Sequence, residues 1–337
     1  MEDMVGSTSF WQGKTAFVTG ATGLVGSWLV SDLLAAQARV VALIHHPDPQ
    51  SRLFQTGLYK DTSIIQGNLE DYSTLEQAIN KYEVDSVFHL AAQAIVGVAY
   101  RSPLATFESN VRGTYNLLES CRHHSGLVKR VVVASSDKAY GAQDILPYIE
   151  EMPLRGKYPY EVSKSCADLI SQSYYHSYGL PVAIARCGNI YGGGDLNWSR
   201  IVPAAIRCSL ENRQLEIRSD GTFVRDYIYV KDVTHAYLCL AEKLDDPGVT
   251  GQAFNFSPWQ PVNVLELVEH IQALIACKPL KPLILNSAAG EIHSQFLDSS
   301  KAKAVLSWQP RYTLEEGLLE TIDWYRDYLF KNKESLS

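Results

Sequence analysis

The stretch TAFVTGATGLVG, residues 15–26, decides the fold of this chain of 337 residues. It joins a short apolar run to three glycines spaced G-x-x-G-x-x-G, and a segment of helical period follows from Leu24 to Leu34. Glycine allows a tight turn, close approach to a pyrophosphate and packing of the helix on the strand, while the helix N-terminus offers N–H groups to phosphates. The stretch therefore predicts a dinucleotide site. The alternative is a tight turn without a ligand.

Further apolar runs alternate with helical segments through the first half, at residues 39–44, 63–67, 86–92, 130–136 and 181–187. Near-continuous Val, Ile and Ala runs separated by helices predict a parallel sheet covered on both faces, the doubly wound α/β (Rossmann) fold.

The pattern changes near residue 190, where a glycine-rich polar loop begins. Beyond it we expect a short strand in QLEIRS and helices at 201–211, 231–243, 262–276 and 313–330. We therefore predict a nucleotide-binding domain over residues 1–186 and a smaller α+β lobe over 187–337. Segments near 224–256 are expected to return to the main sheet.

The composition excludes several classes of protein. With 30 Lys plus Arg against 37 Asp plus Glu, the net charge of −7 argues against a nucleic-acid partner. No apolar run approaches the ~18 residues of a membrane span. The N-terminal MEDMVGSTSFWQGK lacks the features of a secretory signal and predicts a poorly ordered lead-in.

The cysteines indicate a cytoplasmic protein with reduced thiols. There are six, Cys121, Cys166, Cys187, Cys208, Cys239 and Cys277. Their spacing fits neither a metal site nor a disulfide framework, so we expect no metal.

The end of the second strand bears on the choice of cofactor. An acid about 20 residues after the glycine loop ordinarily binds the adenosine ribose of NAD. Here His45 and His46 stand at that place, with Asp48 and Arg52 slightly later, and Asn68 after the third strand is a candidate adenine contact. We expect NAD, with NADP as the alternative.

Two later segments carry candidate chemistry. Ser136 lies at the carboxyl end of the predicted strand at 130–136, and ligands bind at the carboxyl ends of such strands. Tyr160 and Lys164 are spaced i, i+4, so they share one helix face. An ammonium beside a phenol lowers its pKa from about 10, so Tyr160 could act as a base while Ser136 binds the same substrate hydroxyl. The alternatives are a surface helix pair and a regulator that senses the cofactor.

Together these motifs resemble the extended short-chain dehydrogenases/reductases of the nucleotide-sugar epimerase/dehydratase superfamily. The matching segments are TGATGLVG (19–26), HLAAQ (89–93), SSDKAYG (135–141), YEVSK (160–164), RCGNIYGGGD (186–195) and RDYIYVKDV (225–233). The Ser-Asp-Lys run, PDPQSRLF (47–54), GGGDLNWSRIVP (192–203) and LSWQPRYTLEEGL (306–318) are most similar to CDP-glucose 4,6-dehydratases.

This resemblance implies a 4,6-dehydratase of a nucleotide sugar. Tyr160 would take the C4 hydroxyl proton while NAD accepts the hydride, water would leave across C5 and C6, and the hydride would return to C6. Asp137 would act as the acid toward the C6 oxygen and Lys138 would handle the C5 proton, unless the pair only orders the strand end. A C4 epimerase or a 5,6-dehydratase of the same fold is the alternative function.

The resemblance also implies further contacts. For the cofactor they are Gly20, Thr22, Gly23, Leu24, Val25, Gly26, His45, Asn68, Leu69, Leu90, Ala91, Ala92, Tyr160 and Lys164. For the sugar or its diphosphate they are Gln93, Asn189, Arg200 and Arg225, although either arginine could be a solvated surface residue.

A homodimer is implied as well, through a four-helix bundle of helices near 104–123 and 160–178. Leu117, Leu118, Leu169 and Ile170 would supply its apolar side chains, unless they belong to the intramolecular core.

Overall fold

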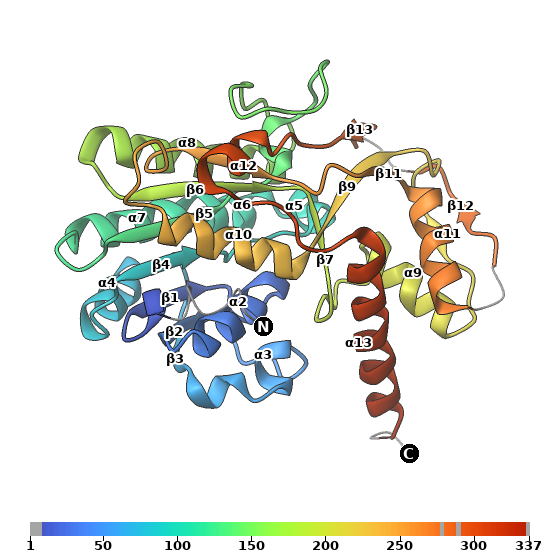
Figure 1. Cartoon of the computed structure of the whole chain (residues 1–337), viewed down its shortest axis with the longest axis horizontal. Coiled ribbons are helices and arrows are strands. Elements are labelled where there is room, and N and C mark those ends of the chain that lie inside the picture. Colours follow the sequence, from blue (N-terminus) through green and yellow to red (C-terminus); the bar gives the residue numbers. More distant parts are fainter. Residues whose placement is uncertain (1–8, 277–279, 288–290, 335–337) are drawn as a thin grey trace.

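A seven-stranded parallel sheet lies at the centre of the larger of the two parts of the molecule (Figure 1). The computed structural model describes residues 9–276, 280–287 and 291–334. The strands are β1 (Thr15–Thr19), β2 (Arg39–Ile44), β3 (Ser63–Gln66), β4 (Ser86–His89), β5 (Arg130–Ala134), β6 (Val182–Cys187) and β10 (Ala253–Phe256). Their order is β10-β6-β5-β4-β1-β2-β3, so the direction of winding reverses between β1 and β4. The predicted doubly wound fold is confirmed, and ligands bind at such reversals.

Alternate residues of each strand face two different cores. Ala16 and Val18 of β1 pack with α2 (Leu24–Ala35) and α10 (Val230–Glu242), while Phe17 packs on the opposite face with α4 (Tyr72–Lys81) and α7 (Gly113–His123). Both faces of the sheet are therefore covered by helices, which explains why its strands are apolar throughout.

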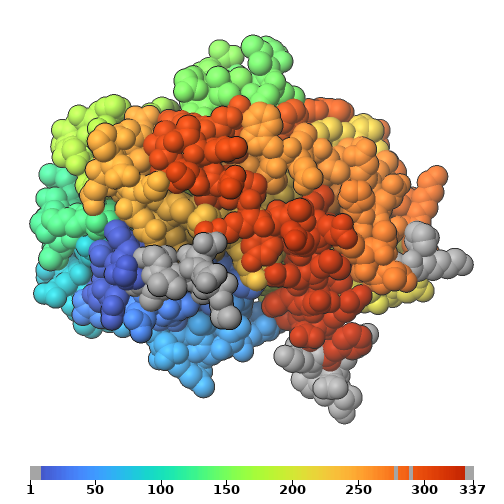
Figure 2. All heavy atoms as spheres, in the orientation of Figure 1, coloured from blue at the N-terminus to red at the C-terminus, as the bar shows by residue number. Residues whose placement is uncertain are grey.

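The part of the molecule built on the seven-stranded sheet contains further helices and short helical turns. They are α3 (Arg52–Gln55), α5 (Val96–Arg101), α6 (Pro103–Phe107), α8 (Pro159–Tyr178), α12 (Ser300–Leu306), the short turns η1 (Leu58–Asp61) and η3 (Asp137–Tyr140), and a π-helical turn η2 (Glu108–Arg112). The loop between η3 and α8, coloured green around residue 145, stands out from the surface in Figure 2, and Ile145 on it is 70% exposed.

A smaller lobe lies at one end of the main sheet (Figure 1). Its four-stranded sheet contains β7 (Asn189–Tyr191), β9 (Val224–Tyr229), β11 (Pro261–Asn263) and β13 (Ser294–Gln295), and β8 (Glu216–Ile217) pairs with β12 (Leu283–Ile284). A third core joins α9 (Ile201–Leu210), α11 (Val264–Ile275) and α13 (Leu314–Glu334) to this sheet. Within residues 224–256, β10 belongs to the main sheet, whereas β9 belongs to the smaller one.

The structure corrects the expected lead-in at the N-terminus. Residues 1–8 lie outside the described part, but residues 9–11 are helical and Trp11 is fully buried. The Trp11 indole donates a hydrogen bond of 2.7 Å to Glu242 on α10. The prediction failed because a single tryptophan that anchors a segment leaves no periodic pattern.

The four leucine and isoleucine residues predicted to form a four-helix bundle differ in their exposure. Leu117 and Leu118 are fully buried in the core beneath α7, and Ile170 packs against that core, so the first two cannot reach a partner. Leu169 is 54% exposed. Other exposed apolar side chains on these helices are Leu104, Tyr115 and Tyr178.

Candidate active site

The glycine loop connects β1 to α2 and fits a dinucleotide. Gly20 has a φ of +75°, and a Cβ there would lie 2.8 Å from the Ala91 backbone nitrogen. A Cβ on Gly26 would lie 2.1 Å from the Gly20 carbonyl oxygen. Among the described residues no side chain caps the N-terminus of α2, which begins after Gly23. The loop thus presents backbone N–H groups where a pyrophosphate would bind.

The predicted cofactor residues after β4 form the opposite wall. The Thr19 hydroxyl accepts hydrogen bonds of 3.2 Å from the Leu90 and Ala91 backbone nitrogens and contacts His89 Nδ1 at 2.9 Å. These bonds end β4 at His89, three residues earlier than predicted, and hold residues 90–92 beside Gly20. Thr22, Leu24 and Val25 occupy the loop and the first turn of α2 across from them.

Ser136 and Tyr160 meet at the carboxyl end of β5, where the Ser136 hydroxyl lies near enough to the phenol to act on its pKa. The strand ends at Ala134, so Ser136 is free of the sheet ladder. Lys164 lies one turn further along α8, and its Nζ donates to the Ala134 carbonyl oxygen at 2.7 Å. The structure therefore brings together the three residues predicted to handle the substrate hydroxyl.

The pKa values of this group differ from expectation. Burial raises the pKa of Tyr160 to about 12, although the Arg200 charge and the Ser136 hydroxyl act in the opposite direction. Burial lowers the pKa of Lys164 to about 8. The prediction that Lys164 lowers the pKa of Tyr160 is wrong as far as the protein's own groups are concerned. Desolvation dominates, and the ammonium is directed at Ala134.

Asp137 and Lys138 form an ion pair beside this group. Lys138 Nζ lies 2.9 Å from Asp137 Oδ2, and Ser136 Oγ donates to Asp137 Oδ1 at 2.9 Å. Asp137 is only 2% exposed. Asp137 is thus buried next to Ser136, while the Lys138 side chain remains 20% exposed.

The predicted substrate residues are distributed unevenly. Arg200 precedes α9, pairs with Asp195 at 3.0 Å, and is near enough for its charge to act on Tyr160. Asn189 is half-buried on β7, next to β9. Gln93 is fixed after β4, where its backbone nitrogen donates to Asn110 Oδ1 at 2.6 Å.

Arg225 does not occupy an open anion site. It is 8% exposed, and its guanidinium donates to the carbonyl oxygens of Val224 (2.8 Å), His293 (2.9 Å) and Ile292. In this arrangement the Arg225 guanidinium links β9 to the segment before β13. Its N–H groups are occupied by carbonyl oxygens and are not directed at a diphosphate.

The predicted adenosine contacts lie at the ends of β2 and β3. The His45 and His46 rings are exposed and their centroids are 3.9 Å apart. Asn68 is exposed, while Leu69 is buried against Gly113 at the start of α7. The Arg52 guanidinium lies 3.8 Å from the Trp28 ring and donates to the Ser27 carbonyl oxygen at 3.0 Å, so it is held on α2.

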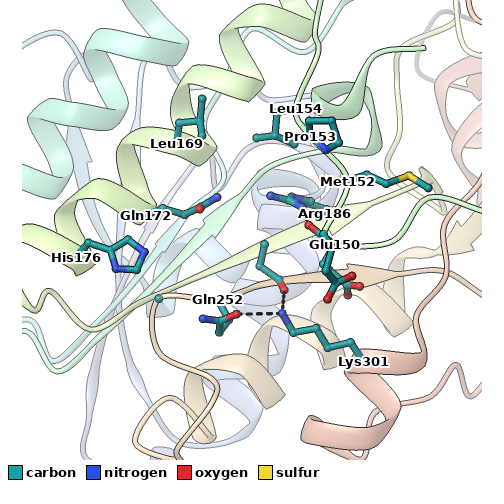
Figure 3. A pocket seen from close by; sticks show the side chains of 13 residues that line it. Glu150, Met152, Pro153, Leu154, Leu169, Gln172, His176, Arg186, Gln252 and Lys301 are labelled. Carbon is teal, nitrogen blue, oxygen red and sulfur yellow. Dashed lines mark hydrogen bonds between the residues drawn. The ribbon is translucent and has the colours of Figure 1, made fainter. Parts of the chain in front are cut away.

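A hollow of about 360 Å³ lies elsewhere, between α8, the loop before it and α12 (Figure 3). Gln172 and His176 on α8 face Lys301 on α12 across it. None of the predicted site residues lines this hollow, and Arg186 on its wall is already paired with Asp168 at 2.8 Å.

Sequence reasoning missed three polar residues that support the site. His89 is buried between Thr19 and Thr114, with its pKa lowered to about 3 by burial. Gln295 of β13 is fully buried against Asp137 and Lys138. Asp226 of β9 is fully buried, and burial, with Asp137 nearby, raises its pKa to about 6. His89 and Asp226 are each a polar residue within an apolar segment, whereas the sequence around Gln295 carries no such signal.

The described residues hold neither a metal-binding cluster nor a membrane-spanning helix. In that part of the chain no group of three or more His, Cys, Asp or Glu side chains is placed to hold a metal ion. No described helix has the length and apolarity needed to cross a membrane. The cysteines at 121, 166, 187, 208 and 239 are unpaired, and Cys277 lies outside the described residues.

Comparison with known proteins identifies a matching family and a similar relative. The model of the NAD-dependent epimerase/dehydratase family matches residues 16–256. The CDP-glucose 4,6-dehydratase of Salmonella typhimurium is 32% identical over 335 residues, which cover 95% of this chain and 93% of that protein.

Solved structures of similar proteins share the fold. The UDP-glucose 4-epimerase of Thermotoga maritima with UDP-glucose has a TM-score of 0.86 at 27% identity, covering 94% of this chain and 99% of the other. The dTDP-glucose 4,6-dehydratase of Bacillus anthracis in complex with NAD has a TM-score of 0.83 at 26% identity, covering 94% and 97%.

Proposed function

The chain belongs to the NAD-dependent epimerase/dehydratase family, and from this premise we propose that it is a nucleotide-sugar 4,6-dehydratase. Its product would be a 4-keto-6-deoxy sugar nucleotide. The observation that carries the proposal is the ion pair between Lys138 and the buried Asp137, directly beside Ser136 and close to Tyr160. Elimination needs a second acid–base pair in addition to the oxidising group, and this pair provides it.

The cofactor would lie along the glycine loop, residues 90–92 and the face of α8 that carries Tyr160 and Lys164. When bound, NAD supplies the hydride acceptor and donor, and its cationic ring favours a phenolate nearby. Tyr160 would take the proton of the C4 hydroxyl while Ser136 orients that hydroxyl. Lys164 would fix the end of β5 through Ala134 and hold positive charge near the phenol.

Elimination follows from the ketone at C4, which acidifies the C5 proton. A base removes that proton while an acid protonates the departing C6 hydroxyl, so that one water leaves. Lys138 and Asp137 are the groups that we assign to these two transfers. The proton that the pair shares would first move from the Lys138 ammonium to Asp137. The neutral Lys138 amine would then take the C5 proton while the Asp137 carboxylic acid protonates the C6 oxygen, which restores the ion pair. Gln93, Asn189 and Arg200 would contact the sugar and its diphosphate, whereas Arg225 would have to leave its carbonyl partners to do so.

One experiment tests this function. The protein is incubated with a panel of nucleotide sugars and NAD or NADP, and the products are analysed by mass spectrometry in deuterated water. A dehydratase gives loss of one water and deuterium at C5. A C4 epimerase, the function of some relatives, gives a product of unchanged mass and would overturn the proposal.

We further propose a cytoplasmic homodimer with no nucleic-acid partner. The proposed interface consists of α7 and α8, joined by α6. The exposed Leu104, Tyr115, Leu169 and Tyr178 on these helices support it, because an interface there would remove their apolar surface from water.

A further inference from the structure

A strand of the smaller lobe reaches the catalytic turn η3. β13 contains only Ser294 and Gln295, and it pairs in parallel with Val224 and Arg225 of β9. Gln295 is fully buried although its side chain is polar. A buried amide requires partners for its oxygen and its nitrogen, so the identity of those partners is informative.

Both polar atoms of the Gln295 side chain bind η3. Its Oε1 accepts a hydrogen bond from Lys138 Nζ, and its Nε2 donates to the Asp137 carbonyl oxygen at 2.9 Å. Lys138 Nζ also donates to Asp137 Oδ2 at 2.9 Å. The Gln295 amide and the ion pair therefore form a ring of hydrogen bonds. The amide oxygen binds the Lys138 ammonium, and the amide nitrogen binds the backbone of η3 at Asp137.

The segment around Gln295 is itself fixed at several points. The Leu297 backbone nitrogen donates to Asp226 Oδ2 at 3.3 Å, and the Tyr148 backbone nitrogen donates to the Phe296 carbonyl oxygen at 2.9 Å. Arg225 donates to the carbonyl oxygen of His293 at 2.9 Å. Gln295 therefore sits on a strand anchored to both parts of the molecule.

We propose that Gln295 is a positioning residue for the elimination step, which orients Lys138 and Asp137 from the smaller lobe. The inference rests on the proposed function. A neutral amide suits the role because it accepts a hydrogen bond from the ammonium without competing with Asp137 for its charge. Neither hydrogen bond of the Gln295 side chain involves Tyr160 or Ser136, so we expect C4 oxidation to depend on Gln295 less than water loss does.

The test separates the two half-reactions. Gln295→Met keeps a side chain of similar volume but removes both hydrogen bonds. With the substrate found in the panel, we expect C4 oxidation to persist and water loss to fall about 10- to 100-fold, as for a misplaced catalytic group. The reduced cofactor should then accumulate and be visible at its own absorbance band, and deuterium incorporation at C5 should slow in parallel.

The control is Gln272→Met, a buried glutamine of the same lobe on α11 whose Nε2 donates to the Leu280 carbonyl oxygen at 2.9 Å. It should leave the balance between oxidation and water loss unchanged. Equal loss of both steps in Gln295→Met, or no change relative to Gln272→Met, would overturn the positioning role. If the wild-type protein dehydrates none of the sugars, the proposed function itself is refuted.

Discussion

The Tyr160 hydroxyl is the atom on which the proposed chemistry depends most directly. The first turn of α8 places it near Ser136 at the carboxyl end of β5. Tyr160→Phe removes only the hydroxyl and keeps the ring. We expect at least a 100-fold loss of turnover, within the ~10²–10⁴-fold range of general acid–base catalysis. Binding of NAD, measured by calorimetry, should stay within a few-fold of wild type.

Two outcomes with Tyr160→Phe would contradict this prediction. Turnover that persists in Tyr160→Phe would move the base to another residue, and loss of NAD binding would mean that the hydroxyl mainly holds the cofactor. Phenylalanine in place of Tyr178, an exposed tyrosine at the other end of α8, is the matched control and should change neither quantity.

Lys164 and Lys138 should affect stability in opposite directions. Burial lowers the folded-state pKa of Lys164 to about 8 from 10.5, so at pH 7 the folded state carries a desolvated ammonium. At roughly 1.4 kcal/mol per pKa unit this costs up to about 3 kcal/mol. Lys164→Met should therefore abolish activity yet raise the free energy of unfolding at pH 7. The gain should shrink between pH 8 and 10.5, because wild type loses this penalty as the folded state releases its proton.

Lys138→Met should instead destabilise the protein. It leaves the Asp137 carboxylate, which is 2% exposed, without its cation, and breaking one side of a buried pair costs about 3 kcal/mol or more. Urea unfolding of both variants at pH 7 and pH 9.5 measures the contrast. Stabilisation by both substitutions, or by neither, would contradict this account of the two lysines.

At the scale of elements, the glycine loop shows how a backbone contact becomes a functional requirement. A Cβ on Gly26 would lie 2.1 Å from the Gly20 carbonyl oxygen and 2.8 Å from its carbonyl carbon, and neither atom belongs to a flexible side chain. Gly26→Ala should push α2 away from β1, cost about 1–3 kcal/mol of stability as overpacking does, and weaken NAD binding at least tenfold. Gly126→Ala, where no atom lies within 4 Å of the added carbon, should be close to neutral.

The element scale also separates what sequence reasoning could reach from what it could not. β1, β2, β6 and α2 were predicted to within one or two residues because each is a buried run next to a glycine, proline or helix signal. β7 and β13 span three and two residues, too short for any periodicity, and they exist only through pairing with β9. The same limit hid Gln295, whose partners lie about 157 positions away.

Among the site residues, the motifs identified the groups but not their electrostatics. The i, i+4 spacing correctly placed Tyr160 and Lys164 on one face of α8, yet it gave no measure of burial. Burial decides the pKa of both groups. Likewise the arginine of RDYIYVKDV was identifiable as a cation, but its engagement with the carbonyl oxygens before β13 is a tertiary contact.

At the scale of the whole molecule, α8 links the chemistry to the proposed dimer. Its N-terminal turns carry Tyr160 and Lys164, and Leu169 further along the same helix is 54% exposed. A charge at this position would have to be desolvated in a helical interface, which is costly without a partner. Leu169→Glu should therefore yield monomers in sedimentation velocity at concentrations where wild type is dimeric.

The control is Leu319→Glu on α13, which is 42% exposed and lies outside the proposed interface. It should leave the sedimentation coefficient unchanged. Because association stabilises the folded state by mass action, the wild-type melting temperature should rise with protein concentration, while that of Leu169→Glu should not. A wild-type protein that sediments as a monomer would refute the proposed dimer. A Leu169→Glu variant that remains dimeric would place the contact away from this part of α8.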